Sequence, residues 1–139
     1  MNIFFDTNII IDFVLNRNPY AHNSRNVINQ SIYYKHTMYL SSLSICNCKY
    51  IIEKNFKSNE RAKLVTKLLL DNFKITNVDD KVIHQAFNST FSDFEDAVQY
   101  FSAKSTSSID MIITRDLKGF SKSDILVATP ETALTILNK

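Results

Sequence analysis

The sequence contains almost no glycine: Gly119 is the only one among 139 residues. Dinucleotide-binding loops of the GxGxxG type and phosphate-binding P-loops both need several glycines, because their backbone must approach phosphate closely. A single glycine therefore excludes both kinds of loop. Many nucleotide-binding interpretations of an α/β chain are excluded with them.

Cysteine and histidine are also scarce. Cys46 and Cys48 are separated by one residue, which is not the CxxC spacing of a redox or zinc site. On a helix their side chains would diverge by about 200°, so they would not form a disulfide with each other. We expect both thiols to be reduced and partly buried. A zinc site built from them and the three scattered histidines (His22, His36, His84) is a minor alternative.

Long apolar runs are absent as well. None approaches the length of about 18 residues that a membrane helix needs, and Asp6 interrupts the apolar start of the chain, so no secretory signal is expected. We therefore expect no membrane association, a cytoplasmic location and one domain spanning residues 1–139. The net charge of +2 neither favours nor excludes a nucleic-acid partner.

Short apolar segments alternate with segments of helical periodicity along the chain. The alternation predicts a parallel α/β sheet covered by helices on both faces, with about five strands and seven helices. The two helices between the second and third strands should form a helical protrusion. The expected strands are 2–5, 37–40, 74–77, 110–114 and 125–128, and the expected helices are 7–16, 22–35, 45–56, 58–70, 79–89, 92–104 and one that begins at residue 130.

Two of the helix starts carry specific capping signals. Ser92 and Glu95 have the spacing of a capping box, in which each side chain accepts from the other residue's backbone N–H. This spacing makes Glu95 a capping residue rather than a catalytic one. Thr129 should cap the last helix, with Pro130 at its first position.

Acidic residues follow two of the expected strands. Asp6 directly follows the first strand, Asp116 follows the fourth, and Asp96 lies in the first turns of a helix. Ligands of an open parallel sheet bind at the carboxyl ends of its strands, so we expect these carboxylates to meet there. Carboxylates that hold Mg²⁺ or Mn²⁺ allow a bound water to attack a phosphodiester. Without metal, their crowding should raise at least one pKa.

Each of these acids also has a structural explanation. An aspartate after a strand is more often a turn or capping residue than a catalytic one. Asp93 fits an exposed first-turn acid, and a helix after Asp6 would carry Asp12 away from the site unless it tilts inward. An Asp-phosphorylated signalling domain is a weaker alternative, because no lysine follows the last strand.

Four segments, in this order along the chain, resemble the motifs of the PIN domain family, which includes the VapC-like toxins. They are residues 6–12, 41–47, 93–97 and 113–116, and residues 129–131 match the lead-in to the last helix. The resemblance covers essentially the whole chain. It implies a three-layer α/β/α fold with a five-stranded parallel sheet in the order 3-2-1-4-5. It also implies a Mg²⁺- or Mn²⁺-dependent endoribonuclease, often the toxin of a toxin–antitoxin pair.

The resemblance also implies roles for individual residues. Three acids would be both catalytic and metal-binding, and three neighbouring polar side chains would support them, since hydrogen-bonded partners hold metal ligands in place. The catalytic and metal-binding residues are Asp6, Asp96 and Asp116, and the supporting residues are Asn8, Asn47 and Thr114.

The chain departs from the family at two positions. Asn47 stands where many members carry Glu or Asp, and Gly119 stands where related sequences often carry another Asp. Both differences lower the negative charge of the pocket. The alternative function is therefore a catalytically weak or inactive PIN-fold module that binds nucleic acid or protein.

Basic side chains flank one of the acids. Arg115, Lys118 and Lys122 surround Asp116 and would contact the phosphates of single-stranded or structured RNA, a salt-sensitive and sequence-independent contact. The lysines of the helical protrusion fit a solvated helix face equally well. That protrusion would also suit an antitoxin segment or a homodimer contact. The aromatic side chains, among them Tyr33, Tyr34, Tyr39 and Tyr50, could suggest base stacking, but most of the set is expected in the core.

Overall fold

The computed structural model describes residues 1–106 and 108–138. Within these residues one parallel sheet of five strands has the order β3-β2-β1-β4-β5, which confirms the expected direction and order. Its strands are β1 (Asn2–Phe5), β2 (Thr37–Ser41), β3 (Phe73–Thr76), β4 (Met111–Ile113) and β5 (Leu126–Ala128).

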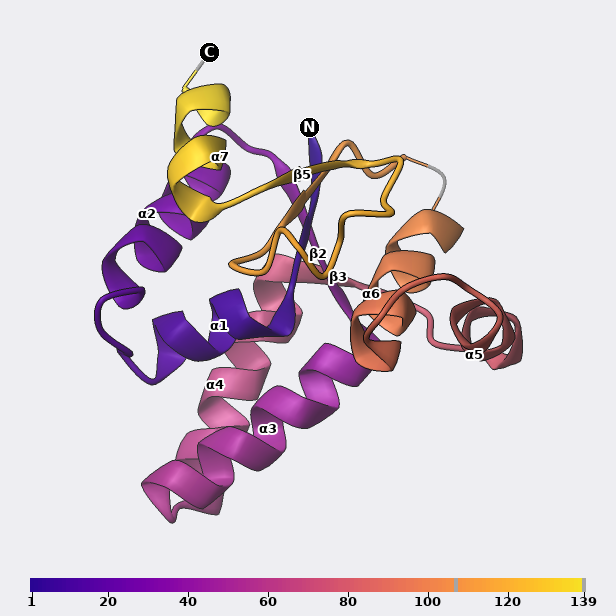
Figure 1. The fold of residues 1–139 in the computed structure, drawn as a ribbon. Coiled ribbons are helices and arrows are strands. Elements are labelled where there is room, and N and C mark those ends of the chain that lie inside the picture. Colours follow the sequence, from indigo (N-terminus) through magenta and orange to yellow (C-terminus); the bar gives the residue numbers. More distant parts are fainter. Residues whose placement is uncertain (107, 139) are drawn as a thin grey trace.

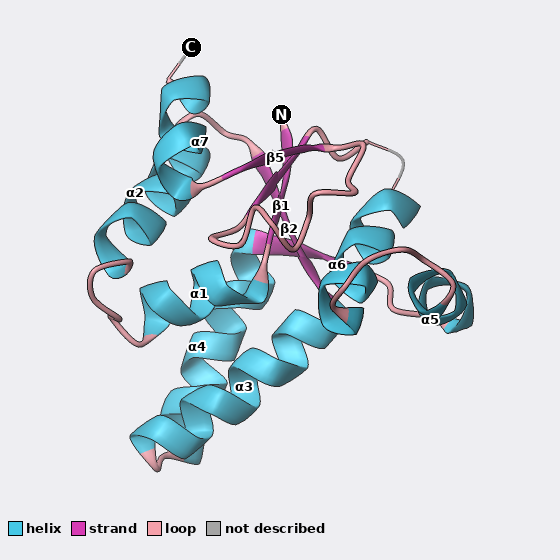
Figure 2. Cartoon of the chain, viewed as in Figure 1, coloured by secondary structure: helices cyan, strands magenta, loops and turns pink. Residues whose placement is uncertain are grey.

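Helices cover both faces of the sheet (Figure 1). Helices α2 and α7 pack together on one side, and α5 and α6 pack together on the other, which gives three layers (Figure 2). Helices α3 and α4 lie side by side and form the predicted protrusion. In the described residues no helix is both long and apolar enough to cross a membrane. The helices are α1 (Thr7–Val14), α2 (Ala21–Tyr33), α3 (Ser42–Phe56), α4 (Asn59–Asn72), α5 (Asp80–Phe87), α6 (Phe94–Ser105) and α7 (Pro130–Leu137).

Burial on both faces explains the continuous apolar sequence of the strands. Side chains of a strand alternate between the two faces of a sheet. Ile3 and Phe5 accordingly pack into the core cluster that includes side chains of α1, α2 and α7. Phe4 points the other way and packs with Tyr100 of α6. The first strand thus holds the two helical layers together before Asp6 ends it.

Capping side chains decide where the helices begin, and they correct two predictions. Helix α3 begins at Ser42, three residues early, because Ser41 accepts a hydrogen bond from the Ser44 N–H at 3.0 Å. Helix α6 begins at Phe94, and its N-cap is Asp93, which accepts from the Asp96 N–H at 2.9 Å. The predicted Ser92–Glu95 capping box is therefore wrong. Thr129 caps α7 with Pro130 at its first position, as predicted.

The burial of the cysteines and tyrosines agrees only partly with the prediction. Both cysteines are free, as expected, but only Cys48 is buried, so the expected partial burial is wrong for the exposed Cys46. Tyr39 lies in the core, but Tyr33, Tyr34 and Tyr50 are exposed, so the core assignment is wrong for those three. The inward faces of their helices are already filled by smaller side chains: Val27, Ile28, Cys48 and Ile52.

Candidate functional site

The sheet brings Asp6 and Asp116 to the same edge. Strands β1 and β4 pair in parallel with Phe5 opposite Ile113, so the chain leaves both strands at their common carboxyl end. Helix α6 adds Asp96 from a third part of the chain. The three acids predicted from the sequence line one pocket of about 390 Å³. The pocket is lined by Asp6, Thr7, Asn8, Ile11, Arg17, Ile51, Asp93, Glu95, Asp96 and Asp116.

Asp6 is buried and held by two hydrogen bonds. Its Oδ1 accepts from the Thr7 N–H at 2.7 Å, which also caps α1. Its Oδ2 accepts from the hydroxyl of Thr114 at 2.7 Å, and the Asp116 N–H donates to that hydroxyl oxygen at 3.0 Å. Thr114 therefore links the Asp6 carboxylate to the backbone of Asp116. These hydrogen bonds are the kind that the prediction for Thr114 requires, and its supporting role in a metal site stays a prediction.

Asp96 and Asp116 meet over the only glycine of the chain. A Cβ atom on residue 119 would lie 2.3 Å from Asp96 Oδ2 and 2.6 Å from Asp116 Oδ2. These two oxygens are therefore less than about 5 Å apart, a separation at which carboxylates repel or share a cation. The Gly119 N–H donates to Asp116 Oδ1 at 3.0 Å. The φ of Gly119 is not positive, so the glycine contributes space for the two carboxylates rather than an unusual backbone conformation.

Burial and mutual repulsion raise the pKa of two of the acids above the ordinary value. Burial raises the pKa of Asp6 to about 6, and the Glu95 and Asp116 carboxylates add to the rise, against the two hydrogen bonds that lower it. Burial also raises the pKa of Asp96 to about 7, with contributions from Asp6, Asp93, Asp116 and Glu95. The protein therefore gathers negative charge that a bound cation would relieve, as expected for crowded carboxylates.

The donor set fits a hard, water-retaining cation. In the described residues no three His, Cys, Asp or Glu side chains are arranged to hold a metal ion together. Mg²⁺ does not need three, since it keeps several waters and usually takes one or two carboxylates from the protein. Asp96 and Asp116 are such a pair, and Asp6 lies on the same pocket wall. The Oδ1 of Asn8, another lining residue, is buried without a hydrogen-bond partner among the described residues.

Asn47 and Glu95 have different positions relative to the pocket from those predicted. Asn47 is not a lining residue, and its Nδ2 donates to Glu95 Oε1 at the long distance of 3.5 Å. Glu95 lines the pocket instead of capping α6. The carboxylate of Glu95 thus occupies part of the region where Asn47 supplies no charge.

Gln99 is a supporting residue that the sequence did not reveal. It lies almost one turn after Asp96, and its amide nitrogen donates to Thr7 Oγ1 and Ser44 Oγ, both at 3.0 Å. Its carbonyl oxygen accepts from Ser41 Oγ at 2.7 Å. This buried network joins the first turns of α1 and α3 to α6, and so connects the elements that carry Asp6 and Asp96. In the sequence, the one hint of this role is that Gln99 is a polar residue on the helix face that becomes buried, where it must find hydrogen-bond partners.

Of the three basic residues predicted to contact RNA, one is paired within the protein and two are exposed. Arg115 Nε donates to Asp12 Oδ2 at 2.5 Å, and the Arg115 guanidinium also lies 3.9 Å from the centre of the Tyr20 ring. Lys118 and Lys122 are exposed and form no ion pair with any described residue. The two lysines therefore remain available to phosphate, whereas Arg115 is engaged within the protein.

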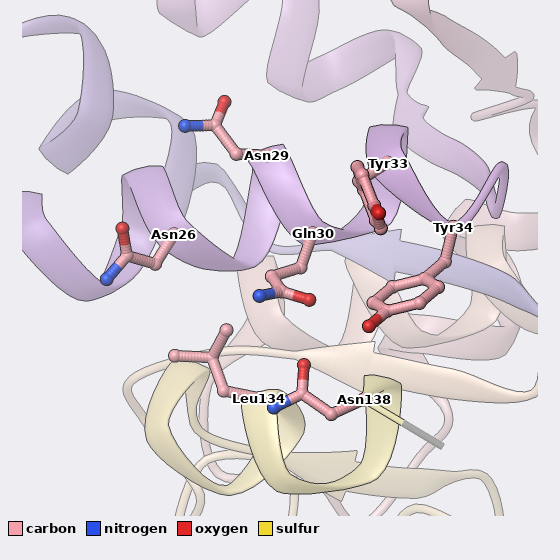
Figure 3. Close-up of a pocket in the computed structure, with 7 residues that line it drawn as sticks. All are labelled: Asn26, Asn29, Gln30, Tyr33, Tyr34, Leu134 and Asn138. Atoms are coloured by element: carbon pink, nitrogen blue, oxygen red, sulfur yellow. The ribbon is translucent and has the colours of Figure 1, made fainter.

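A second hollow lies between α2 and α7, away from the acids. It measures about 610 Å³ and contains no carboxylate, histidine or cysteine among its described lining residues. Figure 3 shows Gln30 of α2 and Tyr34, the residue that follows α2, pointing toward Leu134 of α7 and Asn138, the residue that follows α7. This hollow has no charged side chain among its described lining residues, whereas the acid-lined pocket gathers five carboxylates, so the acid-lined pocket is the candidate site.

Gly119→Ala should weaken metal binding at the pocket by about tenfold, the lower end of the range for disturbed metal-ligand support. The new Cβ cannot coexist with the present positions of the Asp96 and Asp116 carboxylates, so both must move. Mn²⁺ affinity measured by titration calorimetry tests this. Ser121→Ala, on the same loop and exposed, is the matched control. Unchanged Mn²⁺ affinity in Gly119→Ala would show that the glycine is not needed for the site.

The stability of the metal-free protein should depend on pH through Asp6 and Asp96. Their folded pKa values of about 6 and about 7 lie above the ordinary value of 3.8, so the folded state binds these protons more tightly. Their contribution to stability is therefore full below pH about 4 and is lost as pH rises to about 7. Thermal unfolding at several pH values should show a smaller loss for Asp96→Asn than for the wild type. Equal losses of stability in Asp96→Asn and the wild type would contradict a raised pKa for Asp96.

Comparisons with known proteins agree with this architecture. The family model for the PIN domain matches residues 2–118. A toxin–antitoxin complex from Klebsiella pneumoniae contains a similar chain, with a TM-score of 0.68, 21% identity and coverage of 92% of this chain and 97% of that one. No curated protein matches the sequence significantly.

Two DNA-bound complexes contain similar chains as well. The match to VapBC2 from Rickettsia felis, bound to a promoter DNA fragment, has a TM-score of 0.62 and 15% identity, and covers 93% of this chain and 98% of that one. The match to DNA-bound VapBC from Salmonella typhimurium has a TM-score of 0.65 and 18% identity, and covers 94% and 98%. At these identities the similarity establishes the fold.

Proposed function

The chain belongs to the PIN domain family, and from this membership we propose that it is a metal-dependent endoribonuclease that hydrolyses RNA phosphodiester bonds. The observation that carries the proposal is the gathering of Asp6, Asp96 and Asp116 on one pocket at the carboxyl edge of the sheet. Burial and repulsion that raise the pKa values of Asp6 and Asp96 also favour a cation there.

Mg²⁺ or Mn²⁺ held by these acids would lower the pKa of a coordinated water and offset charge on the phosphate. The protein's own contribution is to keep the carboxylates in place. Thr114 fixes Asp6 by a hydrogen bond, and the Gly119 N–H fixes Asp116. Asp6 and Asp96 must also be deprotonated to act as ligands, so loading the site releases protons near neutral pH.

Exposed lysines near the pocket support RNA as the substrate class. Lys118 and Lys122 follow Asp116 on the same loop and form no ion pair with any described residue. Cations beside a phosphodiester-cleaving site hold the substrate backbone without reading its sequence. The proposal therefore includes binding of single-stranded or structured RNA along this loop.

Cleavage of a labelled RNA by the purified protein tests the proposal. We expect Mn²⁺ to support cleavage, a chelator to stop it and added Mn²⁺ to restore it. Asp6→Asn, purified in parallel, controls for a contaminating nuclease and should be inactive. Absence of cleavage with both Mn²⁺ and Mg²⁺ at neutral and alkaline pH, in protein that remains folded, would refute the enzyme assignment.

A PIN-fold module that binds without cleaving is the second candidate. It is favoured by the lack of a three-ligand metal group among the described residues and by the neutral side chain of Asn47. RNA binding without metal-dependent turnover would support this candidate. Robust turnover that the chelator stops would exclude it.

We propose an antitoxin as the protein partner, in the cytoplasm, because similar folds occur in toxin–antitoxin complexes. The protrusion offers a surface for it, since Tyr50, Leu64 and Leu68 are all exposed there. A homodimer through the same surface is the alternative. Co-expression with the neighbouring reading frame, followed by measurement of the mass of the purified complex, separates the two.

A further inference from the structure

Arg17 lies in the acid-lined pocket, although no motif in the sequence points to a role for it. Among the lining residues it is the only cation, beside five carboxylates. We propose that Arg17 binds a phosphate group of the RNA substrate in an orientation fixed by the buried carboxylate of Asp12. This inference rests on the proposed function as an RNA-cleaving protein.

The backbone of Arg17 is fixed on both sides. Its N–H donates to the Asp12 carbonyl oxygen at 3.0 Å, just beyond the end of α1. Its carbonyl oxygen accepts from the N–H groups of Tyr20 and Ala21, at 3.0 and 2.7 Å, which ties it to the start of α2. Arg17 therefore extends from an ordered turn, and little backbone entropy would be lost when it binds a ligand.

The side chain of Arg17 is also oriented, and most of its donors remain free. Its Nε donates to Asp12 Oδ1 at 3.0 Å, while its side chain stays 46% exposed. A guanidinium has five N–H donors, and this contact uses only the one on Nε. The terminal nitrogens thus remain available for the paired hydrogen bonds that arginine makes to phosphate.

The charge balance around Asp12 favours an anion at Arg17. The Asp12 carboxylate, 0% exposed, accepts from Arg115 through Nε and Nη2, at 2.5 and 3.3 Å, as well as from Arg17. One carboxylate balances the charge of only one of the two guanidinium groups. Arg115 makes the two-point contact and is the less exposed of the pair. The remaining positive charge therefore lies toward the pocket, on Arg17.

The pocket needs such a charge if RNA is to approach it. Five carboxylates repel a phosphodiester, and one divalent ion would offset only part of their charge. A fixed cation within the same pocket reduces this repulsion and gives the phosphate an orientation. The exposed lysines of the 118–122 loop attract RNA more generally, whereas Arg17 would position one phosphate beside the acids.

A purely structural role for Arg17 makes a different prediction. If the residue served only to balance Asp12, its removal would lower stability slightly and leave RNA affinity unchanged, because Arg115 still pairs with Asp12. RNA affinity and its salt dependence are therefore the informative measurements. Loss of a phosphate contact lowers both.

The experiment measures RNA binding by fluorescence anisotropy in an Asp96→Asn background with a chelator present, so that neither the proposed cleavage nor bound metal affects the comparison. Arg17→Ala should weaken binding about tenfold and reduce the slope of log affinity against log salt by about 1. Arg17→Lys keeps the charge without the planar geometry, so its affinity should be intermediate. Arg25→Ala is the control, since Arg25 lies on α2 and donates to Asn16 instead.

Each outcome decides the question. Arg17→Ala binding as tightly as Arg25→Ala, or no RNA binding by the Asp96→Asn parent, would overturn the role of Arg17. Weaker binding by Arg17→Ala alone would support it. Cleavage by the wild type is measured separately. A folded wild type that is inactive with both Mn²⁺ and Mg²⁺, together with the expected binding loss, would refute the nuclease and leave Arg17 a phosphate-binding residue.

Discussion

Asp96→Asn should reduce Mn²⁺-dependent RNA cleavage by more than about a hundredfold, since even residues that only support metal ligands cost up to that much. Asp96 Oδ2 is one of the two carboxylate oxygens that converge at Gly119. Its pKa of about 7 shows that its charge is unfavourable without a cation. An asparagine in its place fills the same volume but supplies no charge to hold the ion.

The same substitution should not destabilise the metal-free protein at pH 8. It removes a partly buried negative charge that four neighbouring carboxylates repel. Cleavage, Mn²⁺ affinity and thermal unfolding should therefore be measured together. Asp71→Asn on α4 is the matched control, because Asp71 is exposed and pairs with Lys67. Wild-type Mn²⁺ affinity in Asp96→Asn would remove this residue from the metal site.

Asp12→Ala should lower the free energy of unfolding by about 1.5–3 kcal/mol, the range for hydrogen bonds to a charged group, because the two arginines left behind are partly exposed. Asp12 is fully buried, and it accepts hydrogen bonds from both Arg17 and Arg115. Its removal would leave two neighbouring cations without a counterion. Arg115, whose side chain is only 30% exposed, would bear most of that cost.

Urea unfolding measures this loss of free energy. An m-value equal to that of the wild type would show that the folded and unfolded states keep their compactness. Arg17→Ala provides the comparison. Its cost should stay within about 1 kcal/mol, as for exposed ion pairs, because Asp12 would keep its two bonds from Arg115. Equal losses in the two variants would mean that Asp12 acts through something other than these contacts.

The sheet and the convergence of the acids were predictable because their causes are local. Ile3, Phe4 and Phe5 form one apolar run that must be buried on both faces, and Asp6 ends it. Parallel order then brings the carboxyl ends of strands to one edge, whatever lies between them. The starts of α3 and α6 were less predictable, since several adjacent polar residues can each act as the cap.

Contacts between distant residues could not be predicted from sequence. Asp12 and Arg115 are 103 positions apart, and nothing local to either residue reveals their pairing. The contact of Arg17 with the same carboxylate brings its guanidinium to the pocket, and that arrangement is likewise absent from any local pattern. Gly119 was noted only as a missing charge, because the space it leaves for two carboxylates exists only in three dimensions.

The close contacts at Gly119 restrict how a further acid could be added to this pocket. An aspartate at position 119 would not simply add a carboxylate, because its Cβ would displace the two oxygens that now meet there. Asp96 and Asp116 would have to take up other side-chain positions at the same time. The negative charge of the pocket and the arrangement of its present ligands therefore cannot be changed independently at this position.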